Sequence, residues 1–550
     1  TGKAWIKLAD DTPAGVAFDS KPVVAFMGPE AGGSWNLELD EDGRDDAALV
    51  NALYTTIRSR SLSGRHPAGV NRGWISLVGY EEGGAAALLF GARHAANFSS
   101  ITAVDATEVP AASLTAVGKE LVAPFTGDGS TNGLELNLAA KDVPSAVWMI
   151  GSNKGSVNDH VVSYFKTASA VEANATANSD GEQVFANKDN AAKTVIITED
   201  SDGLTPSSIW SRFIGTHKRL RGLEKGGRLA ITQDYSPKAF TVTEKKFGDE
   251  MRRYITYVPT NYDQLTKDGG KLPLVLVLHG YGATMTGIAE ESRWYDLAEE
   301  NGFIAVFANG MNRDVPMMGN VPSPMWMGGS FGQLGAALGL DSKTDVNFLN
   351  QLLDEMEETY AVDTAREYVT GHSNGSMMTW EMAIQSTDRF AAIGPCGYMV
   401  PWNEDELTSK SKNPIAIWGF LGEYDSVGSA KLEEGNNTTV TLQTWNKING
   451  IDETTAKASK ETVEYANSFA TETFYAGTNK DVPLMRFTEV ADTPHVYLQE
   501  EAEHLWDFFS RFSRGEDGKL YYQADAESDK TEVVKGEYKA DDGWYAAAEN

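Results

Sequence analysis

Residues 366–385 read REYVTGHSNGSMMTWEMAIQ, and this stretch decides the fold. A strand-like run ends at Gly371, and a helix-like run begins after the pattern Gly-x-Ser-x-Gly that Gly371, Ser373 and Gly375 form. The two glycines leave room for a sharp turn, which pushes the serine hydroxyl out at the amino end of the helix. The stretch therefore predicts a nucleophile elbow with Ser373 as the nucleophile. A plain turn is the alternative.

The second half of the chain alternates strand-like and helix-like segments around this elbow. Near-continuous apolar runs, such as LPLVLVLHG at 272–280 and IAIWGFL at 415–421, are typical of strands buried on both faces. Residues 345–360 carry a helical apolar stripe, with Asp345 as the candidate N-cap. The alternation predicts an α/β fold with a mostly parallel sheet and helices on both faces.

Segments of the first half repeat this order in weaker form, which predicts a tandem duplication. The elbow glycines recur as Gly79 and Gly83, but Glu81 stands at the serine position. The expected acid and base positions fall near Lys154 and Glu199, so every triad position is lost. We therefore predict a degenerate domain at 1–225, a catalytic domain at 226–515 and an acidic appendage at 516–550. The six paired segments are 22–33 with 273–283, 45–57 with 345–356, 73–90 with 367–382, 98–110 with 390–401, 145–157 with 415–427, and 207–219 with 503–515.

A nucleophilic serine needs a base and an acid, expected downstream in the order carboxylate, then histidine. Glu423 and Asp425 follow the strand at 415–421, and we prefer Asp425 because it lies further into the loop. His495 and His504 come later. A catalytic histidine must move between the serine and the leaving group, so the loop residue His495 is favoured over the helical His504.

The segment ahead of the elbow predicts the rest of the site. A strand ending in His279-Gly280-Tyr281 is a common source of an oxyanion hole, whose donors would be the backbone N–H groups of Tyr281 and Asn374. His279 itself is expected to have a structural role rather than to act as the base. The methionine-rich segment after residue 310 leaves the carboxyl end of a strand, where ligands bind. We assign Trp326, Met327 and His279 to the substrate site, and a loop packed against a domain contact is the alternative.

Charge and composition exclude several classes of partner. Of 550 residues, 47 are basic and 78 acidic, so the net charge is −31. So acidic a chain repels phosphate backbones and offers no polybasic membrane anchor, so we expect neither a nucleic-acid nor a membrane partner. The longest apolar runs are strand-sized, well short of the roughly 18–20 residues that span a bilayer.

The single cysteine, Cys396, rules out an intrachain disulfide and a zinc site built on cysteines. It stands in the apolar run AAIGPCGYMV, so we expect a small buried side chain. We expect no metal site. The chain begins with Thr1, so either a leader has been removed or the chain has been cut. Its acidity and scarce cysteine favour a secreted or extracellular protein.

Four stretches together resemble the polyhydroxybutyrate depolymerase-like esterases, which are α/β-hydrolases close to feruloyl and acetylxylan esterases. They are HGYGA at 279–283, residues 345–380 around the elbow, GEYD at 422–425 and PHVY at 494–497. The resemblance covers about residues 238–515. It implies an α/β-hydrolase fold, no cofactor, and hydrolysis of a small or polymeric ester through an acyl-enzyme. Together with the duplication predicted from the paired segments, this gives two tandem α/β-hydrolase-like domains. By motif it places the nucleophile, acid and base on Ser373, Asp425 and His495.

The resemblance does not choose between polyester, feruloyl and acetyl esters. Two alternatives remain open at this point. A serine peptidase on the same fold would use the same three residues, and a binding protein with two inert copies would use none of them. The intact elbow at Ser373 favours an enzyme. The oligomeric state is not indicated by the sequence.

Overall fold

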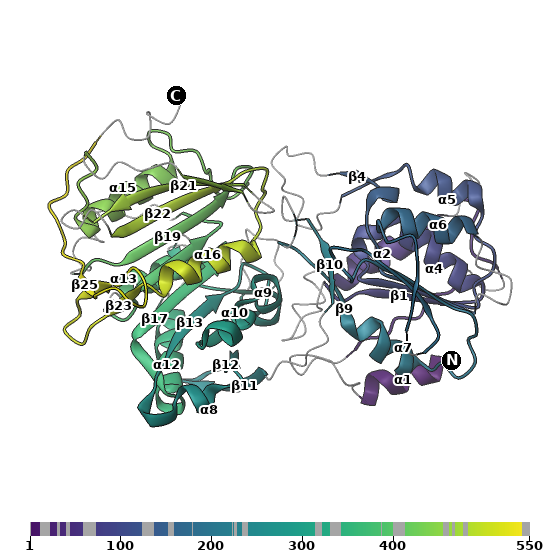
Figure 1. The fold of residues 1–550 in the computed structure, drawn as a ribbon, viewed down its shortest axis with the longest axis horizontal. Coiled ribbons are helices and arrows are strands. Elements are labelled where there is room, and N and C mark those ends of the chain that lie inside the picture. Colours follow the sequence, from purple (N-terminus) through teal and green to yellow (C-terminus); the bar gives the residue numbers. More distant parts are fainter. Residues whose placement is uncertain are drawn as a thin grey trace. The chain divides into compact units, whose positions relative to one another are not determined.

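The structure is a computed structural model of the whole chain, and it divides into two compact units (Figure 1). Unit 1 comprises residues 1–128, 135–221 and 228–238, and unit 2 comprises residues 129–134, 222–227 and 239–550. The structure describes residues 2–11, 22–29, 33–39, 45–58, 73–123, 137–151, 159–178, 180–222, 224, 228–233, 240–313, 322–329, 343–386, 388–399, 413–454, 461–464, 468–476 and 482–541.

Unit 2 is built on a ten-stranded sheet in the order β11-β12-β14-β13-β17-β18-β19-β22-β21-β20. The strands from β14 to β22 run parallel, while the strands at both edges pair antiparallel. The sheet is therefore mixed, and the predicted parallel arrangement describes its centre. The strands are β11 (Phe240–Phe247), β12 (Glu250–Tyr257), β13 (Leu272–Leu278), β14 (Ile304–Ala308), β17 (Val362–His372), β18 (Ala392–Cys396), β19 (Ala416–Gly422), β20 (Glu461–Glu464), β21 (Ser468–Tyr475) and β22 (Pro483–Val490).

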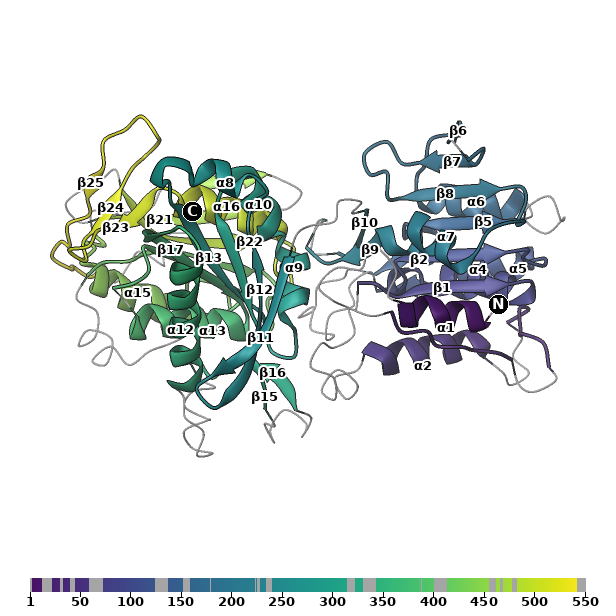
Figure 2. The same ribbon diagram turned by 90° about the horizontal axis from the view of Figure 1, so that it is seen from below.

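Helices cover both faces of this sheet, with α10 and α16 on one side and α12, α13 and α15 on the other (Figure 2). Every residue of β13, β14 and β19 is buried as a result, which explains why these strands read as continuous apolar runs. The helices of unit 2 are α8 (Tyr262–Leu265), α9 (Met285–Ser292), α10 (Trp294–Asn301), α12 (Lys343–Thr359), α13 (Asn374–Gln385), α15 (Asn437–Asn449) and α16 (Gln499–Phe509).

Helix α12 confirms the predicted apolar stripe and corrects its start. The five stripe residues are buried, from Phe348 to Met356. The expected N-cap, Asp345, is wrong, because α12 begins at Lys343 and Asp345 lies inside its first turn. Its carboxylate is instead fully buried and faces Arg252 and Arg313.

Unit 1 has a six-stranded sheet in the order β1-β2-β5-β8-β7-β6, parallel from β1 to β8 and antiparallel beyond. Along β5, Val147 and Met149 join one apolar cluster while Trp148 and Ile150 join another, so both faces of the sheet are covered. Its elements are β1 (Ser76–Tyr80), β2 (Ser100–Val104), β5 (Val147–Ile150), β6 (Thr176–Ala177), β7 (Gln183–Ala186), β8 (Thr194–Thr198), β9 (His217–Leu220), β10 (Ala230–Gln233), α1 (Gly2–Asp11), α2 (Asp46–Arg58), α4 (Glu82–Arg93), α5 (Ala111–Val117), α6 (Asp159–Ala168) and α7 (Pro206–Arg212).

One of the paired segments differs from expectation. Residues 273–278 lie in β13, but residues 22–28 form no strand. Val23 is 78% exposed and Phe26 58% exposed, so this apolar run is not enclosed between helices as β13 is.

The chain after α16 forms a small separate sheet. Strands β23 (Phe512–Arg514), β24 (Leu520–Tyr522) and β25 (Thr531–Glu532) pair antiparallel. Further on, the Lys539 ammonium lies 3.1 Å from the Asp452 carboxylate after α15. Among the helices in the described ranges, none is long and apolar enough to cross a membrane.

Candidate active site

Ser373 occupies a strained turn between β17 and α13. Its backbone has φ 57° and ψ −114°, a region that residues with a side chain rarely adopt. The flanking glycines are required by close approach: a Cβ on Gly371 would lie 2.6 Å from the carbonyl of Gly375, and one on Gly375 would lie 2.2 Å from the carbonyl oxygen of Leu278. The Ser373 N–H donates to the Cys396 carbonyl at 2.8 Å, which ties the turn to β18. The predicted elbow geometry is present.

The Asp425 and His495 side chains meet as a buried pair. His495 Nδ1 donates to Asp425 Oδ2 at 2.8 Å, and the residues are 8% and 5% exposed. The other carboxylate oxygen of Asp425 accepts from the N–H groups of Val427 and Gly428 at 2.8 and 3.1 Å. The Asp425 carboxylate is thus held by the loop after β19, and it orients the imidazole so that Nε2 is the nitrogen left for proton transfer.

The same pair lies beside the elbow. The His495 ring is centred 4.6 Å from the ring of His372, the residue before Ser373. A Cβ on Gly397 would lie 2.8 Å from the His372 ring and 3.2 Å from His495 Cε1. The loop after β22 therefore brings His495 to the carboxyl ends of β17 and β18.

The rejected alternatives have other contacts. Glu423 is exposed and accepts the Asp492 N–H at 3.0 Å, which braces the loop that leads to His495. The ring of His504, in α16, packs against the rings of Trp418 and Phe469 at 5.5 and 5.0 Å.

The two predicted oxyanion donors belong to segments that converge on the elbow. A Cβ on Gly280 would lie 3.4 Å from the Cβ of Ser373, so the turn that contains Tyr281 passes close to the nucleophile. Asn374 is the first residue of α13, where a backbone N–H has no acceptor within the helix. The role of these two N–H groups as oxyanion donors stays a prediction.

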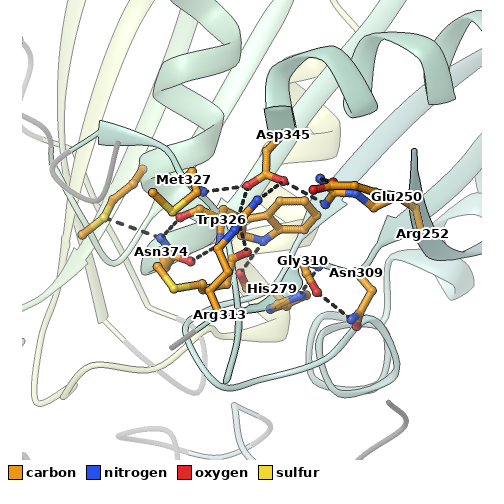
Figure 3. Close-up of polar contacts among 12 residues, drawn as sticks. Glu250, Arg252, His279, Asn309, Gly310, Arg313, Trp326, Met327, Asp345 and Asn374 are labelled. Atoms are coloured by element: carbon orange, nitrogen blue, oxygen red, sulfur yellow. Dashed lines mark hydrogen bonds and ion pairs between the residues drawn. The ribbon is translucent and has the colours of Figure 1, made fainter. Parts of the chain in front are cut away.

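His279 is held as a neutral ring beneath the turn. Its Nδ1 donates to the Gly280 carbonyl at 2.8 Å, and its Nε2 accepts from the Gly310 N–H at 2.9 Å (Figure 3). Burial lowers the pKa of His279 to about 4. Both ring nitrogens are engaged with backbone groups, which agrees with the expected structural role.

Trp326 and Met327 are both buried, and the Trp326 ring is centred 5.2 Å from the ring of His279. The Trp326 indole donates to the His279 carbonyl at 3.0 Å. Its backbone is clamped by the Asn374 side chain, which accepts from the Trp326 N–H at 2.7 Å and donates to its carbonyl at 2.9 Å. Trp326 and His279 therefore support the elbow from inside the fold, and the Met327 N–H is bound to Asp345. Direct contact of these three residues with a substrate stays a prediction. Most of the methionine-rich segment, 314–321 and 330–342, lies outside the described residues.

Two groups of buried ionisable side chains were not predicted from the sequence. Asp345 lies against Arg252 and Arg313, and no local motif announces a pairing between residues so far apart in the chain. Glu501, in α16, is buried beside Cys396, and burial raises the pKa of Glu501 to about 8. Cys396 is fully buried, as expected, and burial raises the pKa of its thiol.

At the elbow of unit 1, Glu81 has φ 52° and ψ −121°, close to the values of Ser373. The histidines that the structure describes in unit 1 are each bound to a backbone carbonyl: His94 to Ala47, His160 to Val109 and His217 to Phe213. The position expected to correspond to the acid, Lys154, lies outside the described residues.

A strained serine elbow after a central parallel strand, flanked by an Asp–His pair on later loops, is the arrangement of an α/β-hydrolase-like fold. Residues 245–478, less than half of the chain, match the family described as "Putative esterase". The resemblance seen in the sequence is confirmed at that level.

Named relatives are similar over parts of the same region. The chain is 26% identical over 163 residues to the bifunctional acetylxylan esterase/xylanase XynS20E of Neocallimastix patriciarum, covering 30% of this chain and 21% of that protein. It is 31% identical over 208 residues to poly(3-hydroxyalkanoate) depolymerase C of Paucimonas lemoignei, covering 33% and 46%. It is 32% identical over 157 residues to feruloyl esterase B of Thermothelomyces thermophilus, covering 28% and 45%. The match spans less than half the length of each relative.

Proposed function

We propose that unit 2 is a carboxylic-ester hydrolase in which Ser373 forms an acyl-enzyme, with His495 as base and Asp425 as the acid that orients it. The observation that carries the proposal is the combination of a strained Ser373 elbow with a buried 2.8 Å contact between His495 and Asp425 beside it. The esterase family match over residues 245–478 supports the same class of reaction.

In this mechanism the Ser373 hydroxyl oxygen attacks the ester carbonyl carbon while His495 Nε2 takes the hydroxyl proton. The tetrahedral oxyanion is stabilised by the N–H groups of Tyr281 and Asn374. His495 then returns the proton to the departing alkoxide, which leaves as the alcohol. A water molecule, deprotonated by the same nitrogen, attacks the acyl-enzyme, and the acid is released as the proton returns to Ser373. Asp425 stabilises the imidazolium in both halves, and no cofactor takes part.

For the substrate we propose an ester in which an acetyl, feruloyl or hydroxyalkanoate acyl group is joined to a carbohydrate, polyester or simple alcohol. The support is that the three similar relatives are named as an acetylxylan esterase/xylanase, a poly(3-hydroxyalkanoate) depolymerase and a feruloyl esterase. The test is to incubate the purified chain with acetylated xylan, methyl ferulate and a short polyhydroxybutyrate oligomer, and to measure released acid. We expect turnover of at least one, abolished in Ser373→Ala. Hydrolysis of peptide anilides but of no ester would contradict the proposal.

We further propose that unit 1 is a degenerate copy of unit 2. The expected domains, 1–225 and 226–515, stay a prediction, and unit 1 extends to residue 238. Buried arginines make matching contacts in the two units. Arg219 donates from Nε to the Phe98 carbonyl at 2.9 Å and from Nη2 to the Pro144 carbonyl at 2.7 Å. Arg514 does the same to Phe390 at 2.9 Å and Pro414 at 3.0 Å.

A second correspondence supports this proposal. The Trp148 indole donates to the Thr198 hydroxyl at 2.8 Å, and the Trp418 indole donates to the Thr488 hydroxyl at 2.8 Å. In each unit the bond joins the strand expected to carry the acid to the next strand of the sheet, which is β5 to β8 in unit 1 and β19 to β22 in unit 2. Because Glu81 stands where the nucleophilic serine is expected, we assign no ester hydrolysis to unit 1.

Export from the cell remains a proposal that rests on composition. A net charge of −31 and a single cysteine suit a protein that works outside the cell. Detection of the chain in culture medium of the source organism, free of a cytoplasmic marker, would test it.

A further inference from the structure

A buried charge network lies behind the elbow, and the proposed mechanism does not use it (Figure 3). At its centre is Asp345, which is fully buried on α12. Its carboxylate lies 2.6 and 3.2 Å from the Arg313 guanidinium and 2.8 Å from Nη1 of Arg252. Glu250 pairs with the far side of Arg252 at 2.6 Å, so two negative and two positive groups balance. A carboxylate this deep persists only with such partners.

The same carboxylate holds the segment that carries Trp326. Oδ2 of Asp345 accepts the N–H of Met327 at 2.8 Å. This segment continues from β16 (Ser323–Met325), which pairs antiparallel with β15 (Met311–Arg313). Arg313 therefore binds Asp345 from the partner strand of the same hairpin, and one carboxylate fixes both sides of it.

The held segment contacts both predicted oxyanion donors. On one side the Asn374 side chain clamps the Trp326 backbone with bonds of 2.7 and 2.9 Å. On the other side the Pro324 carbonyl accepts the Gly282 N–H at 2.9 Å, next to Tyr281. The Trp326 indole also reaches the His279 carbonyl, at the start of the same turn.

We propose that Asp345 is a positioning residue for the oxyanion hole, and that it acts through residues 323–327 to set the separation of the Tyr281 and Asn374 N–H groups. The proposal rests on the proposed function. Oxyanion donors stabilise a transition state only when they are held at the right place before the reaction, so a support that fixes two loops against one segment suits this role.

The network stays charged at the pH values where an esterase works. Burial by itself would raise the pKa of Asp345, but the hydrogen bonds and charge of Arg313, together with the charge of Arg252, hold it below its usual range. An uncharged amide at this position keeps the shape of the side chain, but it leaves the Arg313 guanidinium without its anion and the buried Arg252 with Glu250 alone. Asp345→Asn therefore loosens the support while conserving volume.

The test compares Asp345→Asn with the natural chain on p-nitrophenyl acetate, at a temperature well below unfolding. Rates are divided by the number of active sites titrated with a fluorophosphonate. We expect kcat/KM to fall about 10- to 100-fold, mainly in kcat, since small displacements of reacting groups have effects of this size. Phenylboronic acid forms a tetrahedral adduct with the serine, and its inhibition constant should rise by a similar factor.

The matched control is Glu367→Gln. Glu367 is also a buried carboxylate, 2.7 Å from Arg389, but it sits on β17 six residues before Ser373 and has no part in the hairpin. We expect this variant to lower the melting temperature without changing kcat/KM per active site. A parallel loss of kcat/KM in both variants would overturn the proposal, because destabilisation alone would then explain it.

A double-mutant cycle examines the route. Asn374→Ala keeps its backbone N–H but removes the clamp on Trp326. If Asp345 acts through that clamp, Asp345→Asn should lower kcat/KM little in the Asn374→Ala background, and additive losses would contradict the proposal.

Should Asp345→Asn fail to fold, Arg313→Gln carries the same comparison. Wild-type hydrolysis that is lost in Ser373→Ala but unchanged in Asp345→Asn defeats this inference alone, whereas activity that survives Ser373→Ala defeats the proposed function.

Discussion

Single residues in this chain hold backbone conformations or charges that only a surrounding structure could maintain. Ser373 has a positive φ in a turn where the backbone at Gly371 and Gly375 approaches its neighbours too closely for a Cβ. Glu81 adopts nearly the same angles in unit 1, with a carboxylate where a hydroxyl would stand. The backbone of the elbow is thus compatible with either side chain. The chemistry therefore depends on the side chain at the turn and on the groups that lie beside it.

The neutral state of His279 predicts a dependence of stability on pH. Its folded pKa is about 4, against 6.5 for the free side chain, so the unfolded chain binds the extra proton between these values. The stabilising contribution is complete above pH 6.5 and is lost as the pH falls through 4, by about 3 kcal/mol in all. The free energy of unfolding of unit 2 should therefore fall more steeply over this range in the natural chain than in His279→Gln. Urea titrations at pH 7 and pH 4.5 give this free energy for both chains. An equal fall in the natural chain and in His279→Gln would contradict the assignment.

At this scale the sequence predicted the residues that have a local signature. Order along the chain and loop placement were enough to choose Asp425 and His495, which the structure brings to 2.8 Å. The partners of Asp345 were not predicted, because Asp345 lies on α12 whereas Arg252 and Arg313 lie on β12 and β15. Pairs so far apart in the chain leave no periodic pattern in the sequence.

At the scale of one element, the elbow depends on how closely α13 approaches β13. A methyl group on Gly375 would lie 2.2 Å from the Leu278 carbonyl oxygen, so Gly375→Ala has to push the helix start away from the strand. We expect destabilisation of about 2 kcal/mol or more and loss of ester hydrolysis. Differential scanning fluorimetry and a p-nitrophenyl acetate assay measure both.

The control for this substitution is Gly287→Ala in α9. A Cβ there would meet only the Thr284 hydroxyl at 3.5 Å, an ordinary contact. Alanine is favoured over glycine inside a helix, so the melting temperature should stay the same or rise. An equal loss in both variants would show that the close approach at Gly375 is not what matters.

The apolar pattern predicted strands correctly where both faces of the strand are buried. It was wrong for the apolar run at 22–28, whose side chains are partly exposed to solvent. Strand β13 is buried throughout and matches the predicted 272–280. Residues 22–28 have a similar apolar composition, but Val23 and Phe26 are exposed and no strand forms. The composition of a segment shows that it could be buried. Whether it forms a buried strand depends on neighbouring strands and helices that come from elsewhere in the chain.

For the whole molecule, the account assigns ester hydrolysis to unit 2 alone. In a chain that carries Ser373→Ala, the further substitution Glu81→Ser should restore no activity, because a serine hydroxyl needs a base to become a nucleophile. The described histidines of unit 1 are each occupied by a backbone carbonyl. Release of p-nitrophenol above the Ser373→Ala level would contradict this, and would show that unit 1 retains a working base.

The central claim is that Ser373 is the nucleophile. The most direct measurement is intact mass after treatment with diisopropyl fluorophosphate, followed by peptide mapping, since the reagent labels only a serine activated by a base. The account predicts one adduct per chain, on the peptide that contains Ser373, with hydrolysis of p-nitrophenyl acetate lost in proportion to labelling. The Ser373→Ala chain should take up no label and lose activity by a factor on the order of 10³ or more. Labelling at another serine, or hydrolysis that survives in Ser373→Ala, would contradict it.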